Sequence, residues 1–224
     1  MYAMILAAGH GERMLSLTRD KPKSLLEISD KPLIVYQIES LVLAGIKKII
    51  INTGRFGEQI HDYLGDGKNY DVKIMYSDEG DSPLETAGGV VRALPLLEEK
   101  PFILANADIF TNFDYGELNC KLEHDHAHLV LVNNPEHNKH GDFVLEKGRI
   151  LVAGTHKLTY SGIGCYHPRF FKKYMPNQNH FPLAPLLRRS AEEQTLSGQY
   201  FDGFWNDVGT PERLREISNW HNKK

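Results

Sequence analysis

A glycine-rich segment followed by fixed positive charges lies near the start of this sequence. The apolar run 4–8 stops at Gly9-His10-Gly11, and Arg13 and Lys23 follow within a short distance. Glycine lets a ligand approach the backbone closely because it carries no Cβ. Turn amides can surround an anion, and arginine and lysine add full positive charge beside them. This pattern predicts a site for a phosphate-rich ligand and favours a nucleoside triphosphate.

The glycine-rich segment also fits other structures when it is considered alone. Met14 stands where a GxGxxG dinucleotide loop would have its third glycine, which weakens that interpretation. No Gly-Lys-Ser/Thr follows, so a Walker P-loop is excluded. A tight strand-to-helix turn with incidental surface cations is the structural alternative.

Two aspartates from distant parts of the chain predict a metal site. Asp108 follows the apolar run FILAN, which ends at Asn106, and Asp207 lies in the segment WNDVGT. Mg²⁺ typically takes one or two protein carboxylates together with phosphate oxygens and water. Beside a triphosphate, this pair therefore favours Mg²⁺ as the cofactor. Alternatively, Asp108 forms an Asx turn or caps the next helix, and Asp207 caps a helix that begins at Pro211 or braces a turn.

Small residues gather in the segment PLETAGG, residues 83–89. At the start of a helix they would let a flat base or a ribose lie against the backbone, whose N–H and C=O groups could read the base edge. The alternative is that the glycines serve a close contact between helix and sheet. In that case Glu85 or Thr86 simply caps the helix.

The composition indicates an ordinary globular chain. Hydrophobic residues make up 41% and charged residues 25%, and the net charge of −3 offers no basic field for nucleic acid or a membrane surface. No apolar run approaches the roughly 20 residues that a membrane helix needs. The two cysteines, Cys120 and Cys165, lack CxxC spacing, so we expect buried free thiols in a cytoplasmic protein.

The histidines do not predict a metal centre. The segment HDHAH, residues 124–128, invites that interpretation. We expect it to be a solvated helix end that enters a strand, so that its side chains diverge. Neither Ser-His-Asp nor Cys-His catalysis has a recognisable local signature in the sequence.

Alternating apolar and amphipathic segments must position these residues. In the first half we expect strands at 4–7, 48–52, 72–76 and 102–106 and helices at 33–44, 56–64 and 85–96. In the second half we expect strands at 129–133, 142–145, 149–152 and 159–166 and helices at 168–174, 183–192 and 211–220. The pattern predicts an α/β fold with a doubly wound, mixed and mainly parallel sheet. We expect one domain, 1–224, with a nucleotide-binding half at about 1–110 and a sugar-binding half at about 111–224.

Taken in order, the motifs resemble those of the sugar-1-phosphate nucleotidyltransferase family. The opening signature of that family, roughly LAAGxGxRxxPxTxxxPKxL, is matched at 6–9, Gly11, Arg13, Thr18, 22–23 and Leu25, with Ser16 in place of proline. PLETAGG resembles the base-binding segment of the family, and WNDVGTPERL resembles its second metal element. NAD at 106–108 resembles the first metal element, with Ala107 where glycine is usual. The resemblance covers nearly the whole chain and implies a Rossmann-like, GT-A-like nucleotidyltransferase fold.

The resemblance also implies roles for particular residues. Arg13 would hold the β- and γ-phosphates, Lys23 the α-phosphate or the incoming phosphate, and Asp108 and Asp207 the Mg²⁺ ion. The implied nucleotide-binding set is Leu6, Ala7, Ala8, Gly9, Gly11, Glu12, Arg13, Lys23, Glu85, Gly88 and Asn106. The implied sugar-binding set is Asn106, Asp142, Ser161 and Gly162.

Four segments are most similar to bacterial family members that act in peptidoglycan recycling: GDGKNYDVKIMYSDEGDSPLETAGG, NNPEHNKHGDF, YSGIG and FPLAPLLR. This similarity implies UTP and N-acetylmuramate 1-phosphate as substrates. Lys139, His140 or Arg188 could then meet the lactyl carboxylate. The alternatives are another sugar 1-phosphate (GlcNAc-, glucose- or mannose-1-phosphate), another nucleotide, or a non-catalytic nucleotide-sugar-binding subunit. An oxidoreductase fits less well, and the sequence does not indicate the oligomeric state.

Overall fold

A computed structural model describes residues 1–82, 84–118, 120, 122 and 124–221. The strands are β1 Tyr2–Leu6, β2 Glu27–Ile28, β3 Lys31–Pro32, β4 Lys48–Thr53, β5 Lys73–Asp78, β6 Phe102–Asn106, β7 Ile109–Thr111, β8 Ala127–Val132, β9 Phe143–Glu146, β10 Arg149–Leu151, β11 Lys157–Tyr166, β12 Leu196–Tyr200 and β13 Trp205–Asp207. The α-helices are α1 Leu33–Leu43, α2 Gly57–Leu64, α3 Glu85–Ala93, α4 Pro168–Tyr174, α5 Ala184–Glu192 and α6 Pro211–His221. Among the described residues, no helix is long and apolar enough to cross a membrane.

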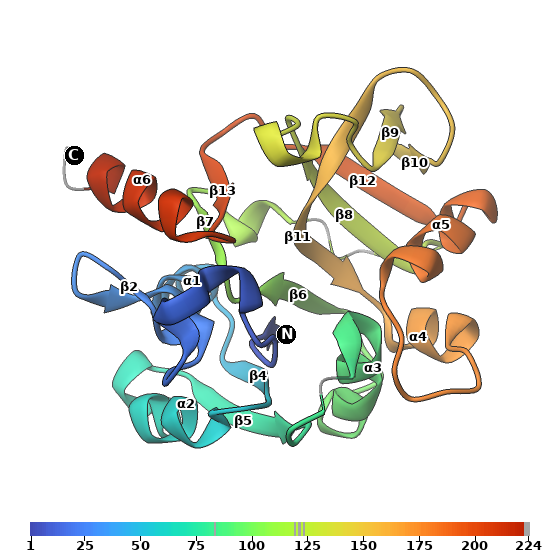
Figure 1. Ribbon diagram of the computed structural model, residues 1–224. Helices are drawn as coiled ribbons and strands as arrows, with labels where there is room; N and C mark the ends of the chain where they lie inside the picture. The colour runs from blue at the N-terminus through green and yellow to red at the C-terminus, as the bar shows by residue number, and fades with distance from the viewer. Residues whose placement is uncertain (83, 119, 121, 123, 222–224) are drawn as a thin grey trace.

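One sheet of nine strands, in the order β5-β4-β1-β6-β11-β8-β12-β10-β9, runs through the molecule (Figure 1). Strands β5, β4, β1 and β6 are parallel to one another, whereas β11 is antiparallel to both β6 and β8. Two short ribbons, β13–β7 and β2–β3, lie outside this sheet. The mixed doubly wound sheet predicted from the sequence is therefore confirmed.

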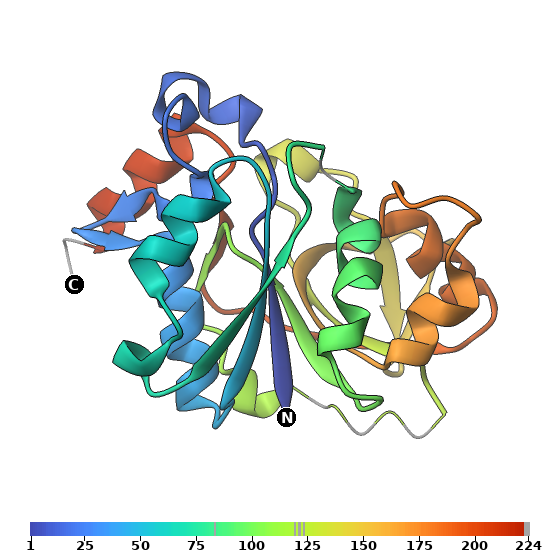
Figure 2. The ribbon, with the colours of Figure 1, turned by 90° about the horizontal axis from the view of Figure 1, so that it is seen from below.

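Successive residues of the central strand supply the cores on the two faces of the sheet. Ala3 and Ile5 of β1 pack with α1 and α2, and Met4 packs with α3, α4 and α5 on the other face. In Figure 2 the two groups of helices lie on opposite sides of the sheet. This burial on both faces explains why the strands read as continuous apolar runs rather than as alternating patterns.

The order in which strands are added to the sheet switches sides at β1: β4 and β5 lie on one side of it, and β6 lies on the other. Strand β1 pairs with β4 on one side and with β6 on the other, in register from Tyr2 to Leu6. In open α/β sheets, ligands bind beyond the carboxyl ends of the strands at such a switch point. The glycine-rich segment follows β1, and Asp108 follows β6, so the topology brings both motifs to this place.

Several local expectations were incomplete or wrong. The helix expected at 85–96 ends at Ala93 and continues as a 3₁₀ turn, Leu94–Leu96, that contains Pro95. Strands β2, β3, β7 and β13 span two or three residues, too few to show a period in the sequence. Strand β12 was also missed, since its sequence LSGQY has no clear apolar alternation.

The expectation of two free thiols is wrong, because Cys120 and Cys165 form a disulfide. Their Cα atoms are 5.5 Å apart, within the range that a disulfide spans. Cys165 lies on β11, and the segment after β7 brings Cys120 beside it. The spacing of the two cysteines in the sequence does not indicate that they lie side by side in the fold.

The helix end expected at HDHAH is wrong, because residues 124–126 are not helical, whereas the expected entry into a strand is confirmed by β8. His128 lies on that strand and is only 7% exposed. Its Nδ1 and Nε2 atoms lie 2.9 Å from Ser197 Oγ and 3.0 Å from Gln199 Oε1, both on β12. This histidine therefore joins two strands of the sheet.

His128 should make the stability of the fold sensitive to acid. Burial lowers the pKa of His128 from 6.5, so the unfolded chain binds a proton more readily than the folded one. The full stability is present above about pH 6.5 and falls as the pH drops, by at most about 1.4 kcal/mol per unit. Urea unfolding at pH 7.5 and 5.5 should show a smaller loss in His128→Asn than in wild type. Equal losses would contradict this role.

Candidate active site

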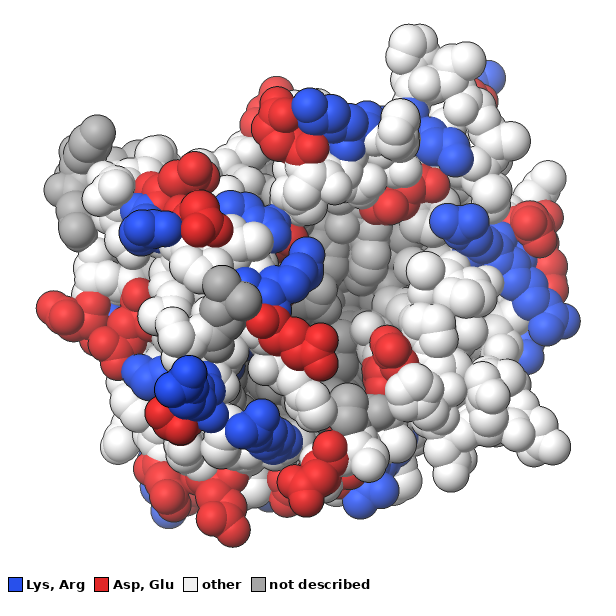
Figure 3. Space-filling model, viewed as in Figure 1, with Lys and Arg blue, Asp and Glu red and all other residues white. Residues whose placement is uncertain are grey.

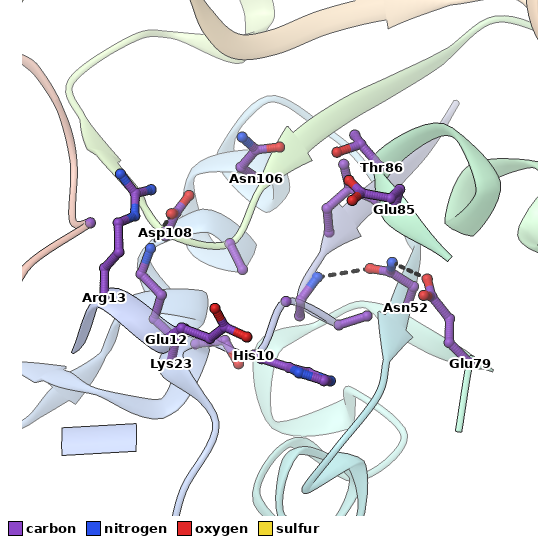
Figure 4. Close-up of a pocket in the computed structure, with 18 residues that line it drawn as sticks. His10, Glu12, Arg13, Lys23, Asn52, Glu79, Glu85, Thr86, Asn106 and Asp108 are labelled. Atoms are coloured by element: carbon purple, nitrogen blue, oxygen red, sulfur yellow. Dashed lines mark hydrogen bonds and ion pairs between the residues drawn. The ribbon is translucent and has the colours of Figure 1, made fainter. Parts of the chain in front are cut away.

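A cavity of about 640 Å³ opens at the carboxyl ends of β1, β4 and β6. All of the residues predicted to bind the nucleotide or the metal line this cavity except Gly88 and Asp207. Figure 4 shows Arg13, Lys23 and Asp108 at one end and Asn52, Glu79, Glu85 and Thr86 at the other. The positive charges of Arg13 and Lys23 make the first end suitable for phosphates. The second end lies beside the segment predicted to bind a base.

The glycine-rich loop brings Lys23 to the cavity. Gly11 has a φ of +65°, and a Cβ there would lie 3.0 Å from Lys23 Cβ and 3.1 Å from Thr18 Cγ2. Thr18 Oγ1 donates to the Gly11 carbonyl at 3.0 Å and fixes the loop against the following 3₁₀ helix, Glu12–Thr18. At Gly9 a Cβ would meet no atom within 4 Å, so space is left beside the backbone. Gly11 therefore serves the packing of the loop, and the close approach of a ligand to the two glycines stays a prediction.

The two predicted metal-binding aspartates are brought together by the β7–β13 ribbon. Asp207 pairs with Ile109 in this ribbon, and Val208 N donates to the Asp108 carbonyl at 2.8 Å. Asp108 is followed by a strand rather than a helix, and Thr210 Oγ1 is the acceptor for the Arg213 N–H at the start of α6. The helix-cap alternatives for both aspartates are therefore wrong.

Each of these carboxylates already binds a cationic side chain. Asp108 Oδ2 forms an ion pair with Lys23 Nζ, and Asp207 Oδ1 forms one with the Arg213 guanidinium. His137 Nε2 also lies 3.1 Å from Asp207 Oδ1. Two carboxylates from adjacent segments of the chain are a donor set that suits Mg²⁺. No group of three or more His, Cys, Asp or Glu in the described part of the chain could hold a metal ion, so phosphate oxygens and water would complete the coordination.

A buried polar pair supports β7 next to Asp108. The Tyr115 hydroxyl donates to Gln37 Oε1, and Gln37 Nε2 donates to the Ile109 carbonyl at 2.5 Å. Burial raises the pKa of Tyr115, so its hydroxyl remains a donor. This chain of contacts runs from α1 to the residue after Asp108 and fixes the strand that carries the carboxylate.

A hydrogen-bonded chain at the other end of the cavity was not predicted. Ala7 N donates to Asn52 Oδ1 at 2.7 Å, and Asn52 Nδ2 donates to Glu79 Oε1 at 2.7 Å. Glu79 Oε2 in turn accepts from Leu84 N at 2.7 Å. Figure 4 shows the two bonds of Asn52, and the bond to Leu84 N extends this chain from β1, β4 and β5 to the start of α3. One signal was present in the sequence, since Asn52 ends the run KIIIN as Asn106 ends FILAN.

The glycines of the PLETAGG segment permit close packing, although not against the sheet alone. A Cβ on Gly88 would overlap the carbonyl oxygen of Asn179, and a Cβ on Gly89 would overlap the Glu79 carboxylate. The N-cap of α3 is Leu84, which has no side-chain cap, so neither Glu85 nor Thr86 caps the helix. Glu85 and Thr86 line the cavity, whereas Pro83 lies outside the described residues.

Of the predicted sugar-binding residues, only Asn106 lines the cavity. A Cβ at Gly162 would lie 2.6 Å from Asn106 Nδ2, so this glycine leaves room for the amide. Ser161 is 1% exposed and donates from Oγ to the Val130 carbonyl at 2.8 Å. Asp142 accepts from Tyr160 N at 2.9 Å and from Asn138 Nδ2 at 3.2 Å. Contacts of Asp142, Ser161 and Gly162 with a sugar therefore stay predictions.

Figure 3 shows a hollow in this face of the molecule with acidic and basic side chains around it. The candidates for a lactyl carboxylate lie apart from the lining of the main cavity. Lys139 and His140 line a second cavity of about 410 Å³. Arg188 lies on an exposed part of α5.

Known proteins match this chain over almost its full length. The family model described as nucleotidyl transferase matches residues 2–224. An N-acetylmuramate alpha-1-phosphate uridylyltransferase of Neisseria meningitidis serogroup B is 46% identical over 96% of this chain and 96% of its own length. The protein of that name in Caulobacter vibrioides is 30% identical over 94% of this chain and 92% of its own length.

Solved structures agree on the fold. The structure of a UDP-glucose pyrophosphorylase complexed with UDP-glucose aligns with a TM-score of 0.80 and covers 99% of this chain and 98% of that one. Its sequence is 22% identical to this one, so the likeness concerns the fold alone.

Proposed function

Because this chain belongs to the nucleotidyl transferase family, we propose that it transfers a uridylyl group from UTP to N-acetylmuramate α-1-phosphate. The products would be UDP-N-acetylmuramate and pyrophosphate. The observation that carries this proposal is the 46% identity, over 96% of both chains, with the Neisseria uridylyltransferase of that specificity. Arg13, Lys23 and Asp108 at one end of the cavity would supply the groups that such a reaction needs.

In this reaction a phosphate oxygen of the sugar attacks the α-phosphorus of UTP in line. A bond forms between that oxygen and the α-phosphorus, and the bond from the α-phosphorus to the pyrophosphate oxygen breaks. The attacking phosphate is already an anion near neutral pH, so no general base is required. Catalysis then rests on positioning and on the neutralisation of charge. Arg13 would hold the β- and γ-phosphates, and Lys23 would bind the α-phosphate.

We propose Mg²⁺ as the cofactor, held by Asp108 and Asp207. A magnesium ion bound there supplies positive charge that orients the phosphates and stabilises the transferring group. The two cationic side chains paired with these carboxylates are then available to bind phosphate oxygens. A non-catalytic subunit would need no pair of metal ligands in order to bind a nucleotide sugar. The presence of the full set argues for an enzyme: Arg13, Lys23, Asp108 and Asp207.

A matrix of nucleotides and sugar phosphates tests the specificity. UTP, dTTP, CTP and GTP would each be combined with the 1-phosphates of N-acetylmuramate, GlcNAc, glucose and mannose, and pyrophosphate release would be measured. We expect the highest kcat/KM for UTP with N-acetylmuramate α-1-phosphate. A higher value for another pair would assign a sister specificity. Absence of release from every pair would favour the non-catalytic alternative.

A further inference from the structure

Arg213 is a cation at the edge of the cavity that the sequence motifs did not assign. It comes from the first turn of α6, and its side chain is only 13% exposed. A Cβ on Gly209 would overlap the Arg213 guanidinium, and Gly209 itself lines the main cavity. The glycine therefore leaves room for this guanidinium directly beside the cavity.

Arg213 occupies the carboxylate that the metal would need. Its Nη1 atom is bound to Asp207 Oδ1 and lies 3.1 Å from His137 Nε2. Lys23 occupies Asp108 in the same way. Both proposed metal ligands are thus neutralised by a side chain of the protein. A divalent cation on these carboxylates would repel both side chains, because like charges a few ångströms apart interact strongly at a partly buried site.

Once displaced, each cation needs an anion. Lys23 lies on the same side as Arg13, within the loop that faces the triphosphate. Arg213 approaches from α6, next to His137 of the 3₁₀ helix Glu136–Asn138 in the predicted sugar-binding half. With Arg13 and Lys23 assigned to the phosphates of UTP, the phosphate of the incoming sugar is the anion that remains for Arg213. A guanidinium suits it, because its planar fork binds two phosphate oxygens at once.

We propose that Arg213 holds Asp207 before the metal binds and then binds the phosphate of the acceptor sugar. This inference rests on the proposed function, and it adds the residue that couples metal binding to acceptor binding. It makes two separate statements: Arg213 competes with the metal, and Arg213 lowers the KM for the sugar 1-phosphate.

The first statement is tested without substrate. Mn²⁺ binding to the whole protein would be measured by electron paramagnetic resonance. The affinity should be about 3- to 10-fold higher in Arg213→Met than in wild type, because the hydrogen bond from Arg213 to Asp207 no longer competes with the metal. Arg215→Met is the matched control on the same helix. Arg215 is exposed and binds the Glu212 carboxylate and the Pro211 carbonyl, neither of which is a proposed metal ligand, so its loss should leave the Mn²⁺ affinity unchanged.

The second statement is tested by steady-state kinetics. Arg213→Met should raise the KM for the sugar 1-phosphate by at least about 10-fold, the loss of one charged hydrogen bond, while the KM for UTP changes less than about twofold. Arg213→Lys keeps the charge without the planar fork, and its KM for the sugar 1-phosphate should lie between those of wild type and Arg213→Met. If Arg213→Met does not fold, the lysine variant must still show a raised KM.

The outcomes separate this inference from the proposed function. An unchanged KM for the sugar phosphate, or Mn²⁺ binding that is unchanged or weaker in Arg213→Met, would overturn the role of Arg213. Absence of pyrophosphate release from the wild-type protein would overturn the proposed function instead. In that case the Mn²⁺ affinities, which need no substrate, still decide whether Arg213 competes with the metal, and equal affinities overturn the inference.

Discussion

Asp108→Asn is expected to lower kcat for pyrophosphate release by at least about 100-fold, because loss of a group that only supports a metal ligand already costs about 10- to 100-fold. The amide removes the negative charge that holds Mg²⁺ while keeping the shape of the side chain. Stability should fall by no more than about 1 kcal/mol, since the Lys23–Asp108 pair is partly exposed. Turnover measured across a Mg²⁺ titration, together with urea unfolding, checks both expectations.

Asp207→Asn should behave similarly, because the β7–β13 ribbon places it beside Asp108. Asp66→Asn is the control: this carboxylate is exposed, pairs with Lys68 and does not line the cavity. It should retain wild-type turnover at every Mg²⁺ concentration. If Asp108→Asn also kept wild-type turnover at limiting Mg²⁺, the assignment of the metal site would be wrong.

Lys23→Ala has the second largest expected effect, a loss in kcat/KM of about 10- to 100-fold. This range corresponds to the roughly 1.5–3 kcal/mol of a hydrogen bond to a charged group. Lys23 packs against Gly11 and is bound to Asp108, so its ammonium group lies close to where the metal and the α-phosphate would meet. Initial rates at varied UTP and saturating sugar phosphate measure this loss.

Lys21→Ala provides the comparison for the removal of a lysine from the same loop. Lys21 is not among the residues that line the cavity, and its loss should change kcat/KM by less than about twofold. An effect of less than twofold in Lys23→Ala as well would remove Lys23 from the site. A large effect in both variants would mean that the charge of the loop as a whole matters, rather than the position of Lys23.

Those parts of the fold and site that depend on local sequence could be predicted. The apolar run of β1 and the glycines after it indicate a loop at the carboxyl end of a buried strand, and Asp108 follows β6 in the same way. In a parallel sheet these ends lie at one edge, so the cavity lining was largely expected. Gly11 has a further reason to be glycine that the motif did not indicate, since its φ of +65° suits a residue without a Cβ.

The parts that depend on contacts between distant segments could not be predicted. Gly88 meets the backbone of Asn179, and Asn52 meets Glu79, only because the fold brings their strands and loops together. Cys120 and Cys165 pair for the same reason. In the sequence, Arg213 is one of several charged residues on an amphipathic helix. Only the structure places it beside Gly209 and Asp207. Neither hydrophobic periodicity nor the spacing of residues in the sequence indicates contacts of this kind.

The fate of the sugar phosphate oxygens tests the account most directly. N-Acetylmuramate α-1-phosphate labelled with ¹⁸O at its three terminal phosphate oxygens would be incubated with UTP, Mg²⁺ and the protein, and the products weighed by mass spectrometry. Attack of the sugar phosphate on the α-phosphorus predicts that all of the label enters UDP-N-acetylmuramate and none enters pyrophosphate. Label in the pyrophosphate, or no labelled UDP-N-acetylmuramate, would contradict the account.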